Sequence, residues 1–112
     1  MWSVASGGAS RLWSETRPQA SNFFLTDYME LTLPLALGMA VGRPEKSVIA
    51  LEGDGGLLMK LEALVTAGAK APPNLLVLVF YNAVYAATGG QALPADPSID
   101  LEDFARAARF PQ

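Results

Sequence analysis

Two short, uninterrupted apolar runs constrain the fold of this chain more than any other feature. Ser47–Leu51 and Leu75–Tyr81 show none of the polar–apolar alternation of a strand with one solvated face. Such runs indicate buried strands of a parallel sheet that is covered on both faces. Between them lie a glycine-rich turn, Gly53–Gly56, and an amphipathic helix. The apolar positions of that helix form one continuous face: Leu57, Leu58, Leu61, Leu64 and Val65.

Other segments are helical or irregular in their pattern. Leu31–Val41 is nearly all apolar and predicts a helix, and Ser10–Thr16 predicts a shorter one. Ser3–Ser10 is expected to be the end of a strand that passes into a loop, and Asn82–Ser98 a long loop rich in small residues. Asp100 is expected to cap a last helix. The buried positions of that helix would be Leu101, Phe104, Ala105 and Ala108.

This alternation of strand and helix predicts one α/β domain over residues 1–112. Its expected architecture is a three-layer parallel sheet with helices on both faces. Two strands make a thin sheet, and the chain stops just after Phe110-Pro111. We therefore expect a domain that is truncated at its C-terminal end, as part of a larger domain or of an obligate complex.

The composition excludes several classes of function. The chain has no Cys and no His, which excludes disulfides, thiolate or imidazole zinc sites and Ser-His-Asp triads. A metal here must be a hard cation held by oxygen atoms. A net charge of −3 without a basic run argues against nucleic-acid binding. Leu31–Gly42, the longest apolar run, is shorter than the roughly 20 residues that span a membrane, and Met1–Ala9 lacks the features of a signal peptide, so we expect a cytoplasmic protein.

The turn after the first strand combines glycine with a carboxylate. Backbone N–H groups at such a turn favour a phosphate, whereas the Asp54 side chain would repel one. A divalent cation that bridges carboxylate and phosphate oxygens removes this conflict. Asn82 follows the second strand, 28 positions after Asp54. Because neighbouring parallel strands end at the same sheet edge, these side chains are expected to meet there as ligands of a hard cation such as magnesium or calcium. The turn alone is more typical of a plain Asp-Gly turn in which Asp54 is solvated or caps the helix, and Asn82 is what favours a metal site.

The same residues resemble a known family. Gly53-Asp54-Gly55 followed by Asn82 is similar to the diphosphate and metal motif of thiamine-diphosphate-dependent enzymes. Asn82–Gln91 resembles the Asn-x-x-Tyr-x-x-Thr-Gly-Gly-Gln segment of sulfopyruvate and phosphonopyruvate decarboxylases. Three upstream segments resemble the same branch, namely Ser6–Arg11, Asn22–Phe24 and Ala36–Ala40.

The resemblance implies roles for individual residues. Asp54, the Asn82 side chain and the backbone carbonyl of Val84 would ligate Mg²⁺. Met29 would lie under the bent cofactor, and Tyr85 would line its pocket. The other cofactor contacts would come from the glycine-rich turn, whose backbone N–H groups would hold the diphosphate. These contacts belong to Gly53, Gly55, Gly56 and Leu57.

The resemblance also implies a reaction and a partner. The chain would be the thiamine-diphosphate- and Mg²⁺-binding subunit of a 2-oxo-acid decarboxylase, a carboxy-lyase that acts on a small 2-oxo acid. The Glu that activates the cofactor would come from a separate pyrimidine-binding subunit, since no segment here resembles that domain. The protein would therefore contribute no catalytic residue of its own and would work as a hetero-oligomer. Thr88 and Gln91 are candidates for contact with the substrate or the diphosphate.

Two alternatives remain open at this point. The chain could be the cofactor half of an acetolactate-synthase-like carboligase, or a non-catalytic truncated copy that acts as an interaction module. The segment Asp27–Glu30 favours the second alternative, because two carboxylates and an aromatic side chain replace small residues near the expected aminopyrimidine site. Asp54 and Asn82 together favour cofactor binding. No catalytic role is assigned to Glu30, Glu45, Glu52 or Glu62.

Overall fold

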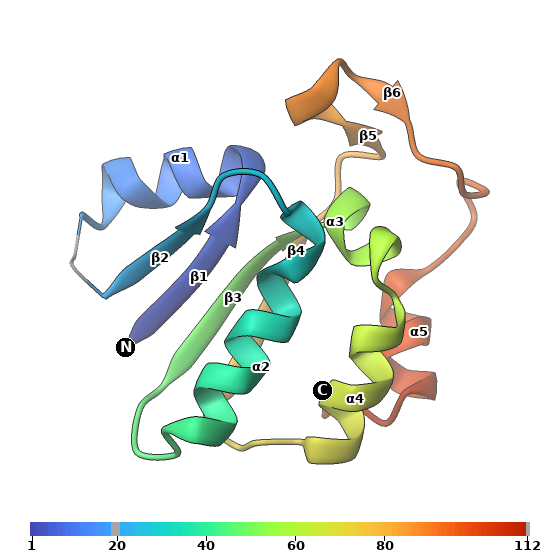
Figure 1. Cartoon of the computed structure of the whole chain (residues 1–112). Helices are drawn as coiled ribbons and strands as arrows, with labels where there is room; N and C mark the ends of the chain where they lie inside the picture. Colours follow the sequence, from blue (N-terminus) through green and yellow to red (C-terminus); the bar gives the residue numbers. More distant parts are fainter. Residues whose placement is uncertain (19–20, 112) are drawn as a thin grey trace.

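The computed structural model of the chain describes residues 1–18 and 21–111. Strands and helices alternate along it (Figure 1). In chain order the elements are β1 Trp2–Ser6, α1 Gly7–Thr16, β2 Asn22–Leu25, the 3-10 helix η1 Met29–Leu31, α2 Thr32–Gly42, β3 Val48–Gly53, α3 Asp54–Met59, α4 Glu62–Lys70, β4 Leu75–Phe80, β5 Val84–Tyr85, the 3-10 helix η2 Ala86–Thr88, β6 Gln91–Ala92 and α5 Leu101–Ala107.

The larger sheet is parallel throughout and has the strand order β2-β1-β3-β4. Helix α1 covers one face of this sheet and α2 covers the other (Figure 1). The predicted three-layer α/β architecture is therefore confirmed. Because all four strands run the same way, the segments that follow β1, β3 and β4 gather at one edge of the sheet.

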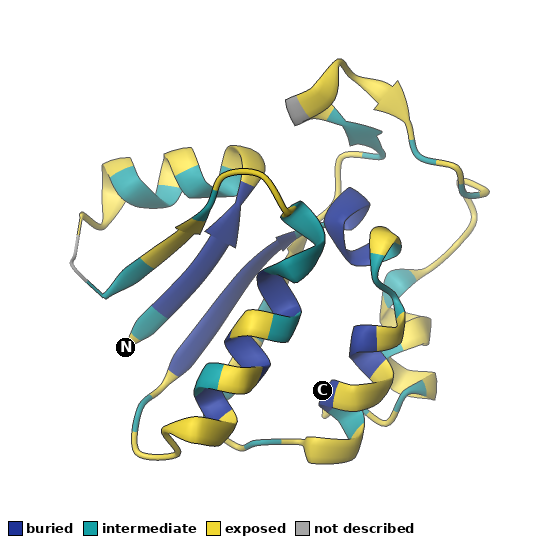
Figure 2. Ribbon diagram, in the orientation of Figure 1, coloured by how far each residue is buried: buried dark blue, intermediate teal, exposed yellow. Residues whose placement is uncertain are grey.

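The central strand β3 explains the uninterrupted apolar run that predicted it. Val48 and Ala50 pack against α2, whereas Ile49 and Leu51 point to the opposite face, toward α1. Successive side chains of a strand alternate between faces, so a strand covered on both sides needs apolar residues at every position. Figure 2 shows the resulting buried centre of the sheet, in dark blue, between more exposed outer elements.

In the larger sheet the prediction located the end of β1, missed β2, and placed the start of the helix between them too late. Ser3–Ser10 contains the end of β1, but Gly7 begins α1 rather than a loop. The strand β2 lies at the sheet edge, where Phe23 and Phe24 are both exposed, so it carries no buried-strand signal. The sheet is accordingly wider than the two strands that the apolar runs indicated.

The predicted helix from Leu57 to Val65 is broken. The helix α3 ends at Met59, and Lys60 leaves the helical region with a φ of −142° and a ψ of 55°. A second helix, α4, begins at Glu62. Val65 is 63% exposed, so the continuous apolar face was wrong at that end. Leu57 and Leu64 nevertheless share one buried cluster with Leu33 and Leu37 of α2.

The C-terminal segments depart from the prediction in two details. Asp100 caps α5 as expected, because its carboxylate accepts the Glu102 N–H at 2.8 Å. Phe104, predicted to be buried, is 39% exposed, whereas Leu101, Ala105 and Ala108 do pack toward α4. The expected loop Asn82–Ser98 contains a small antiparallel ladder between β5 and β6, which lies beyond the carboxyl edge of the main sheet (Figure 1).

Among residues 1–18 and 21–111, no helix has the length and apolar character needed to cross a membrane.

Replacing Asn74 by Ala is expected to lower the free energy of unfolding by about 1–3 kcal/mol. The two protons of the Asn74 amide are shared among the carbonyl oxygens of Lys46, Ala40 and Arg43, at 2.7, 3.0 and 3.2 Å. Asn74 so joins the start of β4 to the end of α2 and the turn before β3. Its loss leaves these carbonyls without that donor. Thermal unfolding followed by circular dichroism measures the change. Asn74→Asp, which keeps the shape but cannot donate, should be at least as unstable, and an unchanged midpoint in both variants contradicts this assignment.

Candidate functional site

A cavity of about 510 Å³ lies at the carboxyl edge of the sheet. Its volume falls in the range of small-molecule sites, roughly 300–1,000 Å³. It is formed where the segments after β1, β3 and β4 converge with η1. Every predicted cofactor or metal residue except Leu57 lines it, namely Met29, Gly53, Asp54, Gly55, Gly56, Asn82, Val84 and Tyr85.

Asp54 is the buried anchor of this cavity. Asp54 is only 2% exposed. One carboxylate oxygen accepts the Gly55 N–H at 2.8 Å, and the other accepts the N–H groups of Asn82 and Ala83 at 3.0 and 2.7 Å. The structure thus brings Asp54 to the Asn82 loop, as the strand order led us to expect, but through the Asn82 main chain and not through its side chain. Within the described part of the chain, no Lys or Arg forms an ion pair with Asp54.

The Asn82 side chain folds back on its own loop. Its amide oxygen accepts the Val84 N–H at 3.1 Å, and the residue is exposed. Ala83 adopts a left-handed conformation, with a φ of 62°, which turns the chain between Asn82 and Val84. An amide oxygen has two lone pairs, so this hydrogen bond leaves one available to another partner.

The oxygen atoms of Asp54 and Asn82 are of a kind that could ligate Mg²⁺. A carboxylate offers about four lone-pair positions, and the Asp54 carboxylate uses three of them for backbone N–H groups. A buried carboxylate without a cationic partner is unfavourable unless a bound cation or further hydrogen bonds compensate its charge. Carboxylate and amide oxygens are hard ligands of the kind that Mg²⁺ prefers.

The two central glycines of the turn are required by close packing. A Cβ atom on Gly55 would lie 2.8 Å from two ring atoms of Tyr85. A Cβ atom on Gly56 would lie 2.6 Å from a carboxylate oxygen of Glu52 and 2.8 Å from the Met29 carbonyl oxygen. The turn is thus packed against the Tyr85 ring and against the Met29 main chain, and these are the two residues that were predicted to contact the cofactor.

Three further predicted residues lie outside the cavity lining. The Leu57 side chain packs in the core with Leu33 and Leu64, so only its backbone could face the cavity. Thr88 and Gln91 are exposed and bond to each other, the Gln91 amide donating to the Thr88 carbonyl at 3.0 Å. The structure does not bring Thr88 and Gln91 to the cavity wall.

Glu52 is the residue that the sequence reasoning missed. It is 1% exposed, directly before the glycine-rich turn, and it accepts the N–H groups of Leu33 and Gly53, each at 3.2 Å. Burial raises the pKa of the Glu52 carboxyl to about 7, the two N–H groups oppose this rise, and the neighbouring Glu30 carboxylate adds to it. The only signal in the sequence is one acidic residue inside an otherwise apolar strand.

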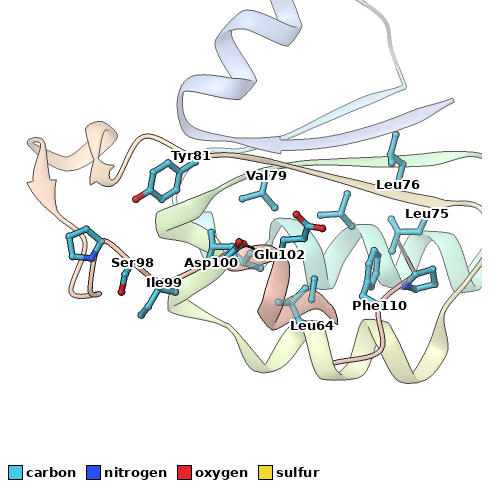
Figure 3. Close-up of a pocket in the computed structure, with 16 residues that line it drawn as sticks. Leu64, Leu75, Leu76, Val79, Tyr81, Ser98, Ile99, Asp100, Glu102 and Phe110 are labelled. Carbon is cyan, nitrogen blue, oxygen red and sulfur yellow. Dashed lines mark hydrogen bonds between the residues drawn. The ribbon is translucent and has the colours of Figure 1, made fainter. Parts of the chain in front are cut away.

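A larger cavity, of about 830 Å³, lies between β4 and α5 (Figure 3). The residues that line this cavity are mainly apolar and include Leu75, Val79 and Phe110. Asp100 and Glu102 also belong to the lining (Figure 3). Leu57 is the one predicted site residue in its lining. Volume alone therefore does not identify the site; the convergence of the predicted residues does.

Comparison with known proteins is consistent with this geometry. Residues 5–109 match the family described as "Thiamine pyrophosphate enzyme, C-terminal TPP binding domain". The chain is 42% identical over 91 residues to a sulfopyruvate decarboxylase of Methanosarcina acetivorans, covering 81% of this chain and 23% of the relative. It is 38% identical over 104 residues to sulfopyruvate decarboxylase subunit beta of Methanothermobacter thermautotrophicus, covering 93% of this chain and 55% of that subunit. A phosphonopyruvate decarboxylase of Streptomyces viridochromogenes is 35% identical over 104 residues, covering 93% of this chain and 26% of the relative.

These matches extend over only part of each relative. The chain spans about half the length of the beta subunit and about a quarter of the two longer decarboxylases.

Proposed function

Because the chain belongs to the thiamine pyrophosphate enzymes, as their C-terminal TPP-binding domain, we propose that it is the diphosphate-binding part of a 2-oxo-acid decarboxylase. Thiamine diphosphate and Mg²⁺ would occupy the 510 Å³ cavity. One observation carries this proposal: Asp54 is a buried carboxylate at the cavity wall, bonded to the loop of Asn82 and without an ion-pair partner in the described chain.

In this proposal each side of the cavity binds a different part of the cofactor. The metal ligands are the Asp54 carboxylate, the Asn82 amide oxygen and the Val84 carbonyl. The N–H groups of Gly55, Gly56 and Leu57 hold the diphosphate, and Gly53 belongs to the same turn. Met29 and Tyr85 contact the rings. Two observations support these roles. All of these residues except Leu57 line one cavity, and Gly55 and Gly56 are in close contact with Tyr85 and Met29.

When bound, thiamine diphosphate supplies the electron sink for the pair released as CO₂ leaves a 2-oxo acid. The residues of this chain bind and orient the cofactor rather than move protons. Asp54 is the only carboxylate in the described lining of the cavity, and its oxygens already accept three backbone N–H groups. A group that activates the cofactor must therefore come from outside this lining.

We assign that group to a Glu on a pyrimidine-binding subunit, so that the active form is a hetero-oligomer. The relative from Methanothermobacter thermautotrophicus is called a subunit beta, which implies a partner in that protein. Support from the chain itself comes from large apolar side chains that are left exposed on β2 and β4, a feature of surfaces that bind other proteins. They are Phe23, Phe24, Leu76, Leu78, Val79 and Phe80.

The substrate is proposed to be a small 2-oxo acid of the sulfopyruvate or phosphonopyruvate type, since the relatives are named for these compounds. Recognition of a sulfonate or phosphonate normally uses Arg or Lys. Neither residue type occurs in the described lining of the cavity. We therefore expect the partner to supply the cationic contact to the substrate.

The test is to combine the chain with a candidate pyrimidine-domain subunit and to follow CO₂ release from sulfopyruvate, phosphonopyruvate and pyruvate. We expect release only when both chains, thiamine diphosphate and Mg²⁺ are present, with the sulfonate or phosphonate substrate preferred. Cofactor binding without release from any 2-oxo acid would contradict the decarboxylase assignment. Release of a coupled, longer 2-hydroxy-3-oxo acid instead of an aldehyde would identify a carboligase.

A further inference from the structure

A cluster of buried polar side chains lies beneath the candidate site. It consists of Ser6, Thr32 and Glu52, all buried and each from a different element, β1, α2 and β3. The Thr32 hydroxyl donates to the Ser6 hydroxyl at 2.9 Å and is 3.3 Å from the Met29 carbonyl oxygen, the alternative acceptor for its single proton. The cluster therefore joins the segments that form three walls of the cavity.

Glu52 accepts two backbone N–H groups from different parts of the chain. One of its oxygens accepts the N–H of Leu33, 19 positions earlier in the chain, and the other accepts the N–H of Gly53. Leu33 is the second residue of α2, where N–H groups have no partner inside the helix. Helix α2 has no side-chain cap at its own N-cap residue, Leu31. The Glu52 carboxylate takes that place from the neighbouring strand.

The two groups that Glu52 joins are the two halves of the proposed cofactor site. Leu33 lies two residues after the end of η1, which begins at Met29, and Gly53 directly precedes Asp54. Gly56 lies close to both Glu52 and Met29. A Cβ atom on Gly56 would lie 2.6 Å from a Glu52 carboxylate oxygen and 2.8 Å from the Met29 carbonyl oxygen. A shift of the Glu52 carboxylate therefore changes the distance between Met29 and the metal-binding turn.

Stability alone does not account for a Glu at this position. The described chain offers Glu52 no ion-pair partner, and the charged side chain that acts on it most is another carboxylate, Glu30. An apolar residue of similar volume is often as stable as a buried charge, or more so. The connection between α2 and the turn is what an apolar residue could not provide.

We propose that Glu52 is a positioning residue, whose carboxylate holds Met29 at the distance from the Asp54 turn that thiamine diphosphate requires. This inference rests on the proposed function. Inorganic pyrophosphate with Mg²⁺ occupies only the turn, whereas the complete cofactor must also contact Met29. Glu52 therefore matters for the complete cofactor and much less for pyrophosphate.

The experiment compares two ligands by titration calorimetry, using the full chain together with its pyrimidine-domain subunit. Glu52→Gln keeps the size of the side chain but places an amide N–H₂ against one of the two N–H donors. We expect its affinity for Mg²⁺-thiamine diphosphate to fall about tenfold, the size of one unsatisfied buried group, and its affinity for Mg²⁺-pyrophosphate to change less than twofold. Glu62→Gln is the matched control, because Glu62 is exposed on α4 and should leave both affinities unchanged.

A double-mutant cycle separates positioning from a general loss of structure. If Glu52 acts through Met29, Glu52→Gln should add little to the loss that Met29→Ala already causes. Where Glu52→Gln does not fold, Thr32→Val is the second variant, because it removes the hydroxyl near the Met29 carbonyl while keeping the side-chain shape. It should weaken the complete cofactor about threefold and spare pyrophosphate.

Three results would overturn the assignment of Glu52: equal loss for both ligands, no loss for either, or additive effects in the cycle. A wild-type protein that binds no Mg²⁺-thiamine diphosphate, even with the partner, is a different failure, since it removes the proposed function and the role of Glu52 with it.

Discussion

Asp54→Asn is expected to weaken Mg²⁺-dependent binding of thiamine diphosphate by about 100-fold, or about 3 kcal/mol, a size typical of removing one partner from a buried charge interaction. The substitution keeps the size of the side chain and removes its charge, so the proposed metal loses its only anionic protein ligand. The diphosphate then meets the turn without a cation between them. Asp54→Ala should bind no better, because it also leaves the N–H groups of Gly55, Asn82 and Ala83 without their acceptor.

Calorimetry with Mg²⁺, and again with a chelator, measures this effect. The chelator should reduce the wild-type affinity to that of Asp54→Asn and should leave the variant unchanged. Asp96→Asn is a suitable control, since Asp96 also accepts a backbone N–H, from Ser98, but is exposed and lies outside the cavity lining. An Asp54→Asn variant that binds the cofactor with Mg²⁺ as tightly as the wild type would remove Asp54 from the metal site.

The parts of the fold that could be predicted are those whose residues report burial locally. β3 appears as an apolar run because a strand covered on both faces cannot alternate. The same pattern located β4 but misjudged its burial, since β4 is an edge strand whose Leu76, Leu78 and Phe80 are exposed. β1 gives a weaker signal, since its buried Ser3 and Ser6 are tolerated only through hydrogen bonds to Asn22 and Thr32. Those partners are 19 and 26 positions away, so no local pattern announces them.

The candidate site, too, could be predicted from the sequence only in part. Asp54 and Asn82 could be paired from the sequence, because the topology of a parallel sheet brings the ends of neighbouring strands together whatever the helix between them does. The break of that helix at Lys60 therefore did not disturb the prediction. Glu52 was missed because glutamate is usually solvated, and its acceptor role depends on the start of α2, which packs there only in the folded chain.

Gly68→Ala is expected to lower the free energy of unfolding by about 2–3 kcal/mol, the upper part of the usual range for overpacking. In an open helix the same change stabilises, by up to about 1 kcal/mol, because Ala has the higher helix propensity. Here the added Cβ atom would overlap the Ala108 carbonyl oxygen and lie 3.0 Å from the Ala108 carbonyl carbon. These are backbone atoms at the end of α5, so they cannot move aside as a flexible side chain could.

The matched control is Gly38→Ala in α2, where a Cβ atom would meet nothing within 4 Å. Thermal unfolding should therefore show opposite signs, with a lower midpoint for Gly68→Ala and an equal or higher one for Gly38→Ala. Equal midpoints would mean that α5 does not pack against α4 as described.

No α5 residue lines the 510 Å³ cavity in the described structure, so the Gly68→Ala variant, while folded, should bind Mg²⁺-thiamine diphosphate as the wild type does. Loss of stability at Gly68 and loss of binding at Asp54 are thus expected to be independent, which a double variant can test by the additivity of the two effects.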